Sequence, residues 1–181
     1  MTSTESVIDE LWRVGETMLN TDSGEKYLIT YSRPSGFLDV IFTSSTESVG
    51  FITIKYEGGG IYSIVNDTSV NPHSSLLNTP GHGIKVKNKF RKRGLGAALL
   101  SIGIGIAQRD WHARGMEGNF KIVASDITNE GLGCYQNFGF TIQEGMSVSS
   151  GYYMDSEHVP EINILPGRVS FFKRLRKRLR L

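Results

Sequence analysis

Residues 91–100 read RKRGLGAALL and join a basic, glycine-containing turn to an apolar helix pattern. Apolar residues recur at helical spacing as far as Ile106, which predicts a helix over about residues 94–112. Just upstream, Ile84-Lys85-Val86 alternates apolar and polar residues as a strand does. A strand, a short glycine turn and a helix N-terminus favour a phosphate, because free backbone N–H groups, the helix dipole and arginine side chains all attract it. The first hypothesis is therefore a pyrophosphate-bearing ligand at residues 91–96.

The composition is that of an ordinary globular domain. Of the 181 residues, 39% are hydrophobic and 21% are charged. The sequence has no apolar run long enough to span a membrane, and its first residues lack a signal-peptide pattern. A single cysteine, Cys134, cannot form an internal disulfide and is expected to be a small core residue. These features predict a cytoplasmic protein.

The charge is unevenly distributed. Residues 168–181 hold seven of the 20 basic residues and no acid, so the remaining chain has 13 basic against 18 acidic residues. Residues 170–181 also carry apolar residues at helical spacing, which predicts a basic amphipathic segment. It could bind an anionic membrane, nucleic acid or an acidic partner, or dock on the body or on a second subunit of a homodimer. We therefore divide the chain into a domain at 1–160 and a linker with a basic tail at 161–181.

The remaining elements predict an α+β fold. An amphipathic helix over residues 5–19 precedes consecutive short strands joined by turns, which is the pattern of an antiparallel meander. The long connection at 66–82 is expected to be functional or mobile. A second helix, starting near Asn129, is predicted between two of the later strands in the sequence. The predicted strands are 26–32, 37–43, 49–56, 61–65, 83–88, 120–125, 140–143 and 151–155.

Two motifs resemble those of the GNAT superfamily of N-acetyltransferases. Ile84-Lys85-Val86 followed by Arg91-x-x-Gly94-x-Gly96 resembles the family's L-x-V and [Q/R]-x-x-G-x-[G/A] block. Asn129 with Cys134–Phe140 resembles its N-x-x-A-x-x-x-Y-x-x-x-G-F block. The sequence departs from the family pattern at Asn88, where many members have Pro, and at Leu132, where they have Ala. The resemblance covers residues 82–143 and implies an α/β three-layer fold, with a mixed, mostly antiparallel twisted sheet of about seven strands flanked by helices.

The resemblance also implies a coenzyme A thioester, such as acetyl-CoA, as the donor. The pyrophosphate would lie on the backbone N–H groups of the turn, and the pantetheine arm would pair with the strand edge at Ile84–Val86. No spacing of histidine, cysteine or carboxylate residues suggests a metal site. The residues implied to bind the coenzyme are Ile84, Lys85, Val86, Arg91, Lys92, Arg93, Gly94, Leu95, Gly96, Ala97 and Asn129.

Acyl transfer to an amine needs a base for the amine and benefits from an acid for the departing thiolate. Tyr135 matches the family's tyrosine general acid. His82 is the favoured base, because it shares a strand face with Ile84 if the strand extends that far, although a solvated loop histidine is an equal alternative. Asp126, at the end of the next strand, is the second candidate base.

The leading interpretation is an N-acyltransferase that moves an acetyl or other acyl group from acyl-CoA to a primary amine in a ternary complex. The alternative is a non-catalytic acyl-CoA-binding regulatory domain whose tail binds membrane or nucleic acid. The acidic body weakly favours a cationic acceptor, because charge of one sign attracts its opposite. The acceptor itself is expected to be chosen by residues 66–82 and the early strands.

Overall fold

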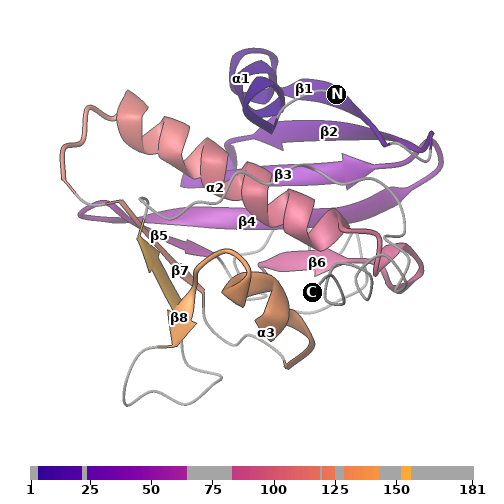
Figure 1. Cartoon of the computed structure of the whole chain (residues 1–181). Coiled ribbons are helices and arrows are strands. Elements are labelled where there is room, and N and C mark those ends of the chain that lie inside the picture. The colour runs from indigo at the N-terminus through magenta and orange to yellow at the C-terminus, as the bar shows by residue number, and fades with distance from the viewer. Residues whose placement is uncertain are drawn as a thin grey trace, which may run out of the picture.

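A computed structural model gives the fold, and it describes residues 4–21, 24–64, 83–118, 120–124, 129–142 and 152–155. Nine strands within these ranges form one sheet, in the order β1-β2-β3-β4-β5-β7-β9-β8, with β6 also paired to β4 (Figure 1). The elements are α1 Thr4–Val14, β1 Glu16–Asn20, β2 Lys26–Ser32, the 3-10 turn η1 Pro34–Gly36, β3 Phe37–Thr43, β4 Ser48–Gly58, β5 Ile61–Ile64, β6 Ile84–Val86, the 3-10 turn η3 Asn88–Phe90, α2 Leu95–Ala113, β7 Lys121–Ala124, α3 Asn129–Gln136, β8 Thr141–Ile142 and β9 Tyr152–Asp155.

The predicted fold class is confirmed. Strands β1 to β5 form an antiparallel meander, and among the described strand pairs only that of β5 with β7 is parallel. The sheet has nine strands where about seven were expected. None of the described helices is long and apolar enough to cross a membrane.

The first helix is shorter than the sequence predicted. It ends at Val14, and residues 16–20 form strand β1 in place of the helical turn expected there. Gly15 has a φ of +88°, a conformation that other residues rarely adopt, so the helix stops there. Along β1, Thr17 and Leu19 are buried while Met18 is exposed, which is the alternation of a strand.

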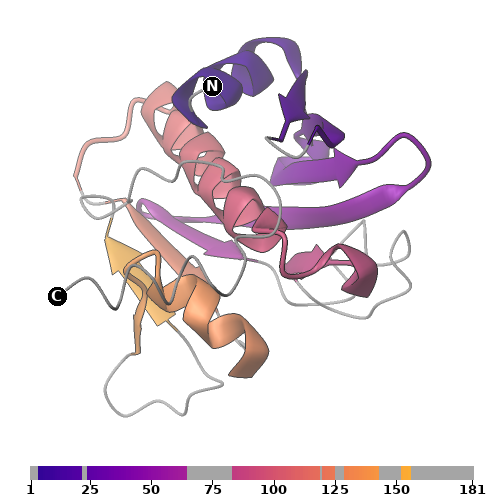
Figure 2. The same cartoon turned by 45° about the vertical axis from the view of Figure 1, so that its right-hand side comes forward.

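Helices α1 and α2 pack together on one face of the sheet (Figure 2). Helix α2 is buried along most of its length and lies across β3 and β4. A Cβ atom on Gly103 would lie 2.9 Å from Ile52 Cδ1, so this glycine allows the helix to approach the sheet closely. A Cβ atom on Gly105 would lie 2.2 Å from Ile8 Cδ1, so this glycine allows α1 and α2 to pack closely against each other.

Strands β5 and β6 are two halves of one interrupted strand. Both lie antiparallel along the edge of β4 that β3 leaves open, with Ile54 opposite Ile64 and Ile52 opposite Ile84. Between these pairs, the Thr53 N–H donates to the Gly83 carbonyl over 2.8 Å. The described part of this edge of β4 is therefore paired with β5 up to Ile64 and with the chain from Gly83 onward, and residues 65–82 lie outside the described residues.

The interruption coincides with a divergence of the sheet. Strand β7 pairs with β5 along its full length, ending with Ala124 opposite Ile64. Among the described strands, β6 pairs only with β4. The edge of β6 that faces away from β4 therefore starts where the β5–β7 ladder stops.

Candidate functional site

Strand β6 directs part of its backbone away from the sheet. Gly83 accepts a hydrogen bond from β4, and the Lys87 N–H donates to the Val49 carbonyl over 2.9 Å. Because alternate residues of an antiparallel strand face the same partner, the polar backbone groups of Ile84 and Val86 point to the other side. The Arg91 Nε–H donates to the Val86 carbonyl over 3.3 Å, which agrees with this direction. This edge can therefore pair with an extended polar ligand.

The N-terminus of α2 adjoins this edge. Gly94 caps the helix in the left-handed conformation, with φ 81° and ψ −2°. The first intrahelical hydrogen bond runs from the Ala98 N–H to the Gly94 carbonyl over 3.0 Å, so the N–H groups of residues 95–97 precede the helical ladder. A Cβ atom on Gly96 would meet the Val86 side chain at 4.0 Å, which places the helix end beside β6. An anion at this end would meet free donors and the positive end of the helix dipole.

The turn before α2 contains the only described residue other than glycine with a positive φ. This residue is Lys92, with a φ of 63°. A glycine would adopt this conformation at a lower cost in free energy than a lysine does. Backbone strain of this kind is often retained at ligand sites.

Six basic residues lie on β6 and in the turn that follows it, and Glu47 and Glu25 form ion pairs with three of them. Glu47 forms ion pairs with Lys87, over 2.9 Å, and with Lys89. Hydrogen bonds from Lys89 and then Lys87 lower the pKa of Glu47. Arg93 pairs with Glu25 and donates to the Lys89 carbonyl over 3.2 Å, so it joins the turn to the loop before β2. The six are Lys85, Lys87, Lys89, Arg91, Lys92 and Arg93.

Tyr135 lies near the end of α3 and is 6% exposed. Its ring contacts Phe140 edge to face, with the centroids 5.1 Å apart. Burial raises the pKa of Tyr135, so its hydroxyl keeps its proton at neutral pH. Cys134 beside it is partly buried, as the sequence predicted for a small core residue, and burial raises the pKa of its thiol. Both views of the fold place α3 on the side of β6 that faces away from β4 (Figures 1 and 2).

The structure brings two of the predicted site segments together and leaves others outside its description. Strand β6 and the turn at residues 91–97 are adjacent, as described above. His82 and Asp126 lie outside the described residues, and so does the side chain of Asn129, whose backbone starts α3. His112 is exposed and its Nδ1 lies 2.7 Å from the Gln108 carbonyl, as expected for a surface histidine. Within the described ranges, no group of three or more His, Cys, Asp or Glu residues could hold a metal ion.

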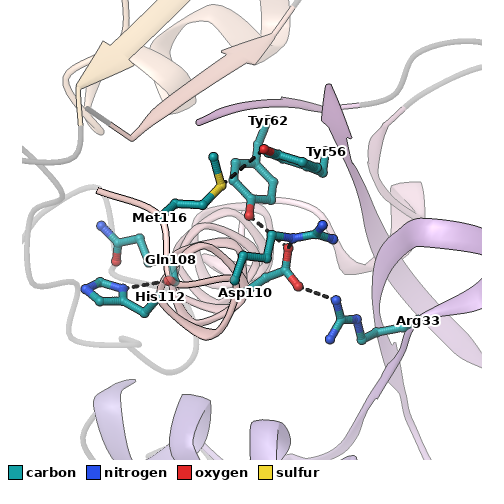
Figure 3. Close-up of polar contacts among 8 residues, drawn as sticks. Arg33, Tyr56, Tyr62, Gln108, Asp110, His112 and Met116 are labelled. Atoms are coloured by element: carbon teal, nitrogen blue, oxygen red, sulfur yellow. Dashed lines mark hydrogen bonds and ion pairs between the residues drawn. The ribbon is translucent and has the colours of Figure 1, made fainter. Parts of the chain in front are cut away.

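The sequence reasoning missed a buried carboxylate on the opposite end of α2. Asp110 has no exposed surface and is bound on both oxygens (Figure 3). Its Oδ1 pairs with Arg33, while its Oδ2 accepts from the Tyr62 hydroxyl over 2.8 Å and from Arg114 Nε over 2.7 Å. Desolvation and then the hydrogen bond to Asp110 raise the pKa of Tyr62. Because Arg33 directly follows β2, Tyr62 lies in β5 and Arg114 directly follows α2, Asp110 holds these three elements together.

Comparisons with known proteins find likeness in structure alone. No family model matches the chain, and no curated protein matches its sequence. The GNAT domain of the S. lividans protein PAT is similar with a TM-score of 0.52 and 11% identity, over 77% of this chain and 96% of that domain. A cAMP-binding acyltransferase from Mycobacterium smegmatis is similar with a TM-score of 0.51 and 10% identity, over 96% of this chain and 57% of its own. The chain therefore has the fold of the GNAT acetyltransferases.

Proposed function

We propose that this protein is an N-acyltransferase that moves an acetyl or other acyl group from acyl-CoA to a primary amine. The observation that carries the proposal is the adjacency of two features. The outward edge of β6 offers the backbone of Ile84 and Val86, and the N-terminus of α2 lies directly beside it. A ligand with an extended amide-containing arm and a pyrophosphate matches both features at once.

The basic residues around the turn support an anionic ligand. Glu47 and Glu25 neutralise part of the charge of the six cations near the turn, which leaves a net positive surface at the helix N-terminus. Arg91 and Lys92 are exposed there and provide additional attraction for phosphate groups. Arg93 already binds Glu25, so we assign it a positioning role in the turn and give the direct phosphate contacts to its neighbours.

The chemistry of acyl transfer assigns roles to the remaining candidates. Acetyl-CoA, when bound, supplies an activated acyl carbonyl. The amine nitrogen forms the new C–N bond as the C–S bond breaks, and Tyr135 holds the proton that the departing sulfur takes up. Burial raises the pKa of Tyr135, so the proton transfer is favourable only if the same apolar surroundings also make the thiolate a stronger base. The amine proton would leave to His82, to Asp126 or to water.

The experiment that tests the proposal measures binding and turnover separately. Isothermal titration measures CoA binding, and a thiol-release assay with acetyl-CoA across a panel of primary amines measures transfer. If the proposal is right, the protein binds CoA and transfers the acetyl group to an amine. Tyr135→Phe then lowers kcat and leaves CoA affinity unchanged. Tight CoA binding without transfer to any amine would favour the alternative, a non-catalytic acyl-CoA-binding domain.

The proposal for the basic tail is tested in the same preparation. Residues 168–181 are expected to bind an anionic surface, and the candidate ligands are membrane, nucleic acid or an acidic protein. Co-sedimentation with anionic liposomes and mobility shifts with RNA, each at low and high salt, distinguish them. A salt-sensitive interaction that is lost when 168–181 is deleted supports this role, and an unchanged interaction contradicts it.

A further inference from the structure

Arg91 links the turn before α2 to the outward edge of β6. Its Nε–H donates to the Val86 carbonyl over 3.3 Å. The next residue of the chain, Lys87, bonds to β4 through its own N–H, which donates to the Val49 carbonyl. Because alternate residues of a strand bond to opposite sides, the Val86 carbonyl points away from β4. The Arg91 guanidinium therefore lies on the side of β6 that faces away from β4.

Val86 is also the residue of β6 that adjoins the N-terminus of α2. A Cβ atom on Gly96 would meet Val86 Cγ2 at 4.0 Å. A ligand with an anion at the helix N-terminus and an extended arm along β6 therefore has Val86 at the junction of its two parts. Arg91 is exposed and Val86 is only partly buried, so both residues can be reached by such a ligand.

The bond between Arg91 and Val86 is one that a ligand can exchange. It is exposed, and its length of 3.3 Å exceeds the usual range of about 2.7–3.2 Å. A guanidinium binds phosphate more strongly than a neutral carbonyl, because both partners are then charged and two parallel hydrogen bonds can form. A phosphate at the helix N-terminus can therefore draw Arg91 away from Val86. The carbonyl that Arg91 leaves can then accept a hydrogen bond from an amide N–H of the arm.

We propose that Arg91 makes the donor site selective for the complete coenzyme over its pantetheine arm alone. This inference rests on the proposed function, which assigns the arm to β6 and the pyrophosphate to the N-terminus of α2. A ligand without phosphate must break the bond between Arg91 and Val86 and makes no new bond with the guanidinium, so its affinity is reduced. A ligand with a pyrophosphate offsets that cost by binding the guanidinium. The donor class is thus a free acyl-CoA, and an acylated pantetheine that lacks the pyrophosphate is disfavoured.

The test measures the affinities of CoA and of pantetheine in the wild type and in Arg91→Ala. Isothermal titration gives the Kd of CoA, and competition with CoA gives the Kd of pantetheine. For pantetheine, Arg91→Ala removes only the bond that must be broken, so its Kd should fall by about 2- to 10-fold. For CoA, the substitution removes that cost together with a larger gain from the charged contact to phosphate, so its Kd should rise by about 10-fold. The two affinities should therefore change in opposite directions.

Lys92→Ala is the matched control. Lys92 is an exposed cation of the same turn, but the bond to Val86 comes from Arg91. We expect weaker binding of CoA in Lys92→Ala, because a positive charge near the phosphates is lost, and a Kd for pantetheine within about two-fold of wild type. Arg91→Met keeps the unbranched stem and removes the donors and the charge. It should reproduce the opposite changes of Arg91→Ala, and it replaces that variant if the alanine lowers Tm.

Three results would overturn the inference. If the substitutions at Arg91 weaken CoA and pantetheine alike, Arg91 only holds the turn against β6. If they weaken CoA and leave the Kd of pantetheine unchanged, Arg91 is only a phosphate ligand. The third result is that pantetheine fails to bind to the wild type and to both Arg91 variants, because release of the Val86 carbonyl then brings no gain to the arm.

Failure of the proposed function gives a different result. If CoA binds and no amine is acylated, the acyltransferase assignment fails, and the two affinities still decide the role of Arg91. If CoA binds and is transferred but the affinities do not change in opposite directions, the inference alone fails. If the wild type does not bind CoA at all, both the proposed donor and the inference are wrong.

Discussion

Substituting Gly50 by alanine is expected to displace β6 and so to weaken coenzyme binding from within the sheet. Gly50 lies opposite Val86 in the β4–β6 ladder. A Cβ atom there would lie 2.5 Å from the Lys85 carbonyl oxygen, 3.1 Å from Leu99 Cδ1 and 3.2 Å from Val86 Cα. Two of these three atoms belong to the backbone of β6, so a side-chain rotation cannot relieve the contact.

The size of the effect follows from the distance to be recovered. Ordinary contact begins at 3.4 Å, so the carbonyl of Lys85 must retreat by about 0.9 Å. Overpacking of this kind costs about 1–3 kcal/mol, and each kcal/mol lowers Tm by about 2–4 °C in a chain of this length. A displacement near 1 Å at a positioned ligand can cost about 100-fold, so we expect CoA affinity to fall by about 10- to 100-fold.

The matched control for Gly50→Ala is Gly103→Ala. It overpacks the same helix–sheet contact, with its Cβ 2.9 Å from Ile52 Cδ1, but it meets the ends of side chains. We expect a comparable or smaller loss of Tm and an unchanged Kd for CoA by isothermal titration. If Gly50→Ala binds CoA as the wild type does, or if both variants lose affinity equally, the position of β6 does not control the coenzyme site.

Three further substitutions test the catalytic and structural assignments. Tyr135→Phe should lower kcat by about 10²- to 10⁴-fold with an unchanged Kd for CoA, and an unaltered kcat in the thiol-release assay would remove Tyr135 from the mechanism. Asp110→Asn should lower the free energy of unfolding by about 2–4 kcal/mol in urea titrations, because the substituted amide cannot serve both arginines, while CoA affinity stays constant. Tyr31→Phe should leave the free energy of unfolding unchanged or raise it by about 1 kcal/mol, because the buried Tyr31 hydroxyl has no partner among the described residues. Burial also raises the pKa of Tyr31 to about 12. A loss of stability above about 1 kcal/mol would show that the hydroxyl has a hydrogen-bond partner.

The sequence predicted most of the fold because its strongest signals are local. The glycine turn at Gly94 and the apolar run of α2 predict a strand–turn–helix unit, and the polar turns between short strands predict the meander. The helix predicted over residues 5–19 was wrong beyond Val14, since Met18 and Leu19 fit a helical face as well as they fit a strand. Gly15, directly after the end of the helix, was the available signal for the correct assignment.

The site could be predicted only in part, because side-chain partners depend on contacts distant in sequence. Arg93 has the sequence position of a phosphate ligand, but it pairs with Glu25, which is 68 residues away. The bond from Arg91 to Val86 likewise depends on how the turn folds back on β6.

The interrupted strand makes the register of the sheet independent of the length of the segment that joins β5 to β6. Since Gly83 resumes the hydrogen-bond line that Ile64 leaves, the sheet register does not depend on how many residues intervene. The entropic cost of closing a loop grows slowly with its length, by about 0.6 kcal/mol for each doubling, so we expect that shortening, lengthening or exchanging residues 65–82 leaves the described sheet folded. The same point is a natural place to open the chain, and fragments 1–64 and 83–181 are candidates for reassembly as a split protein.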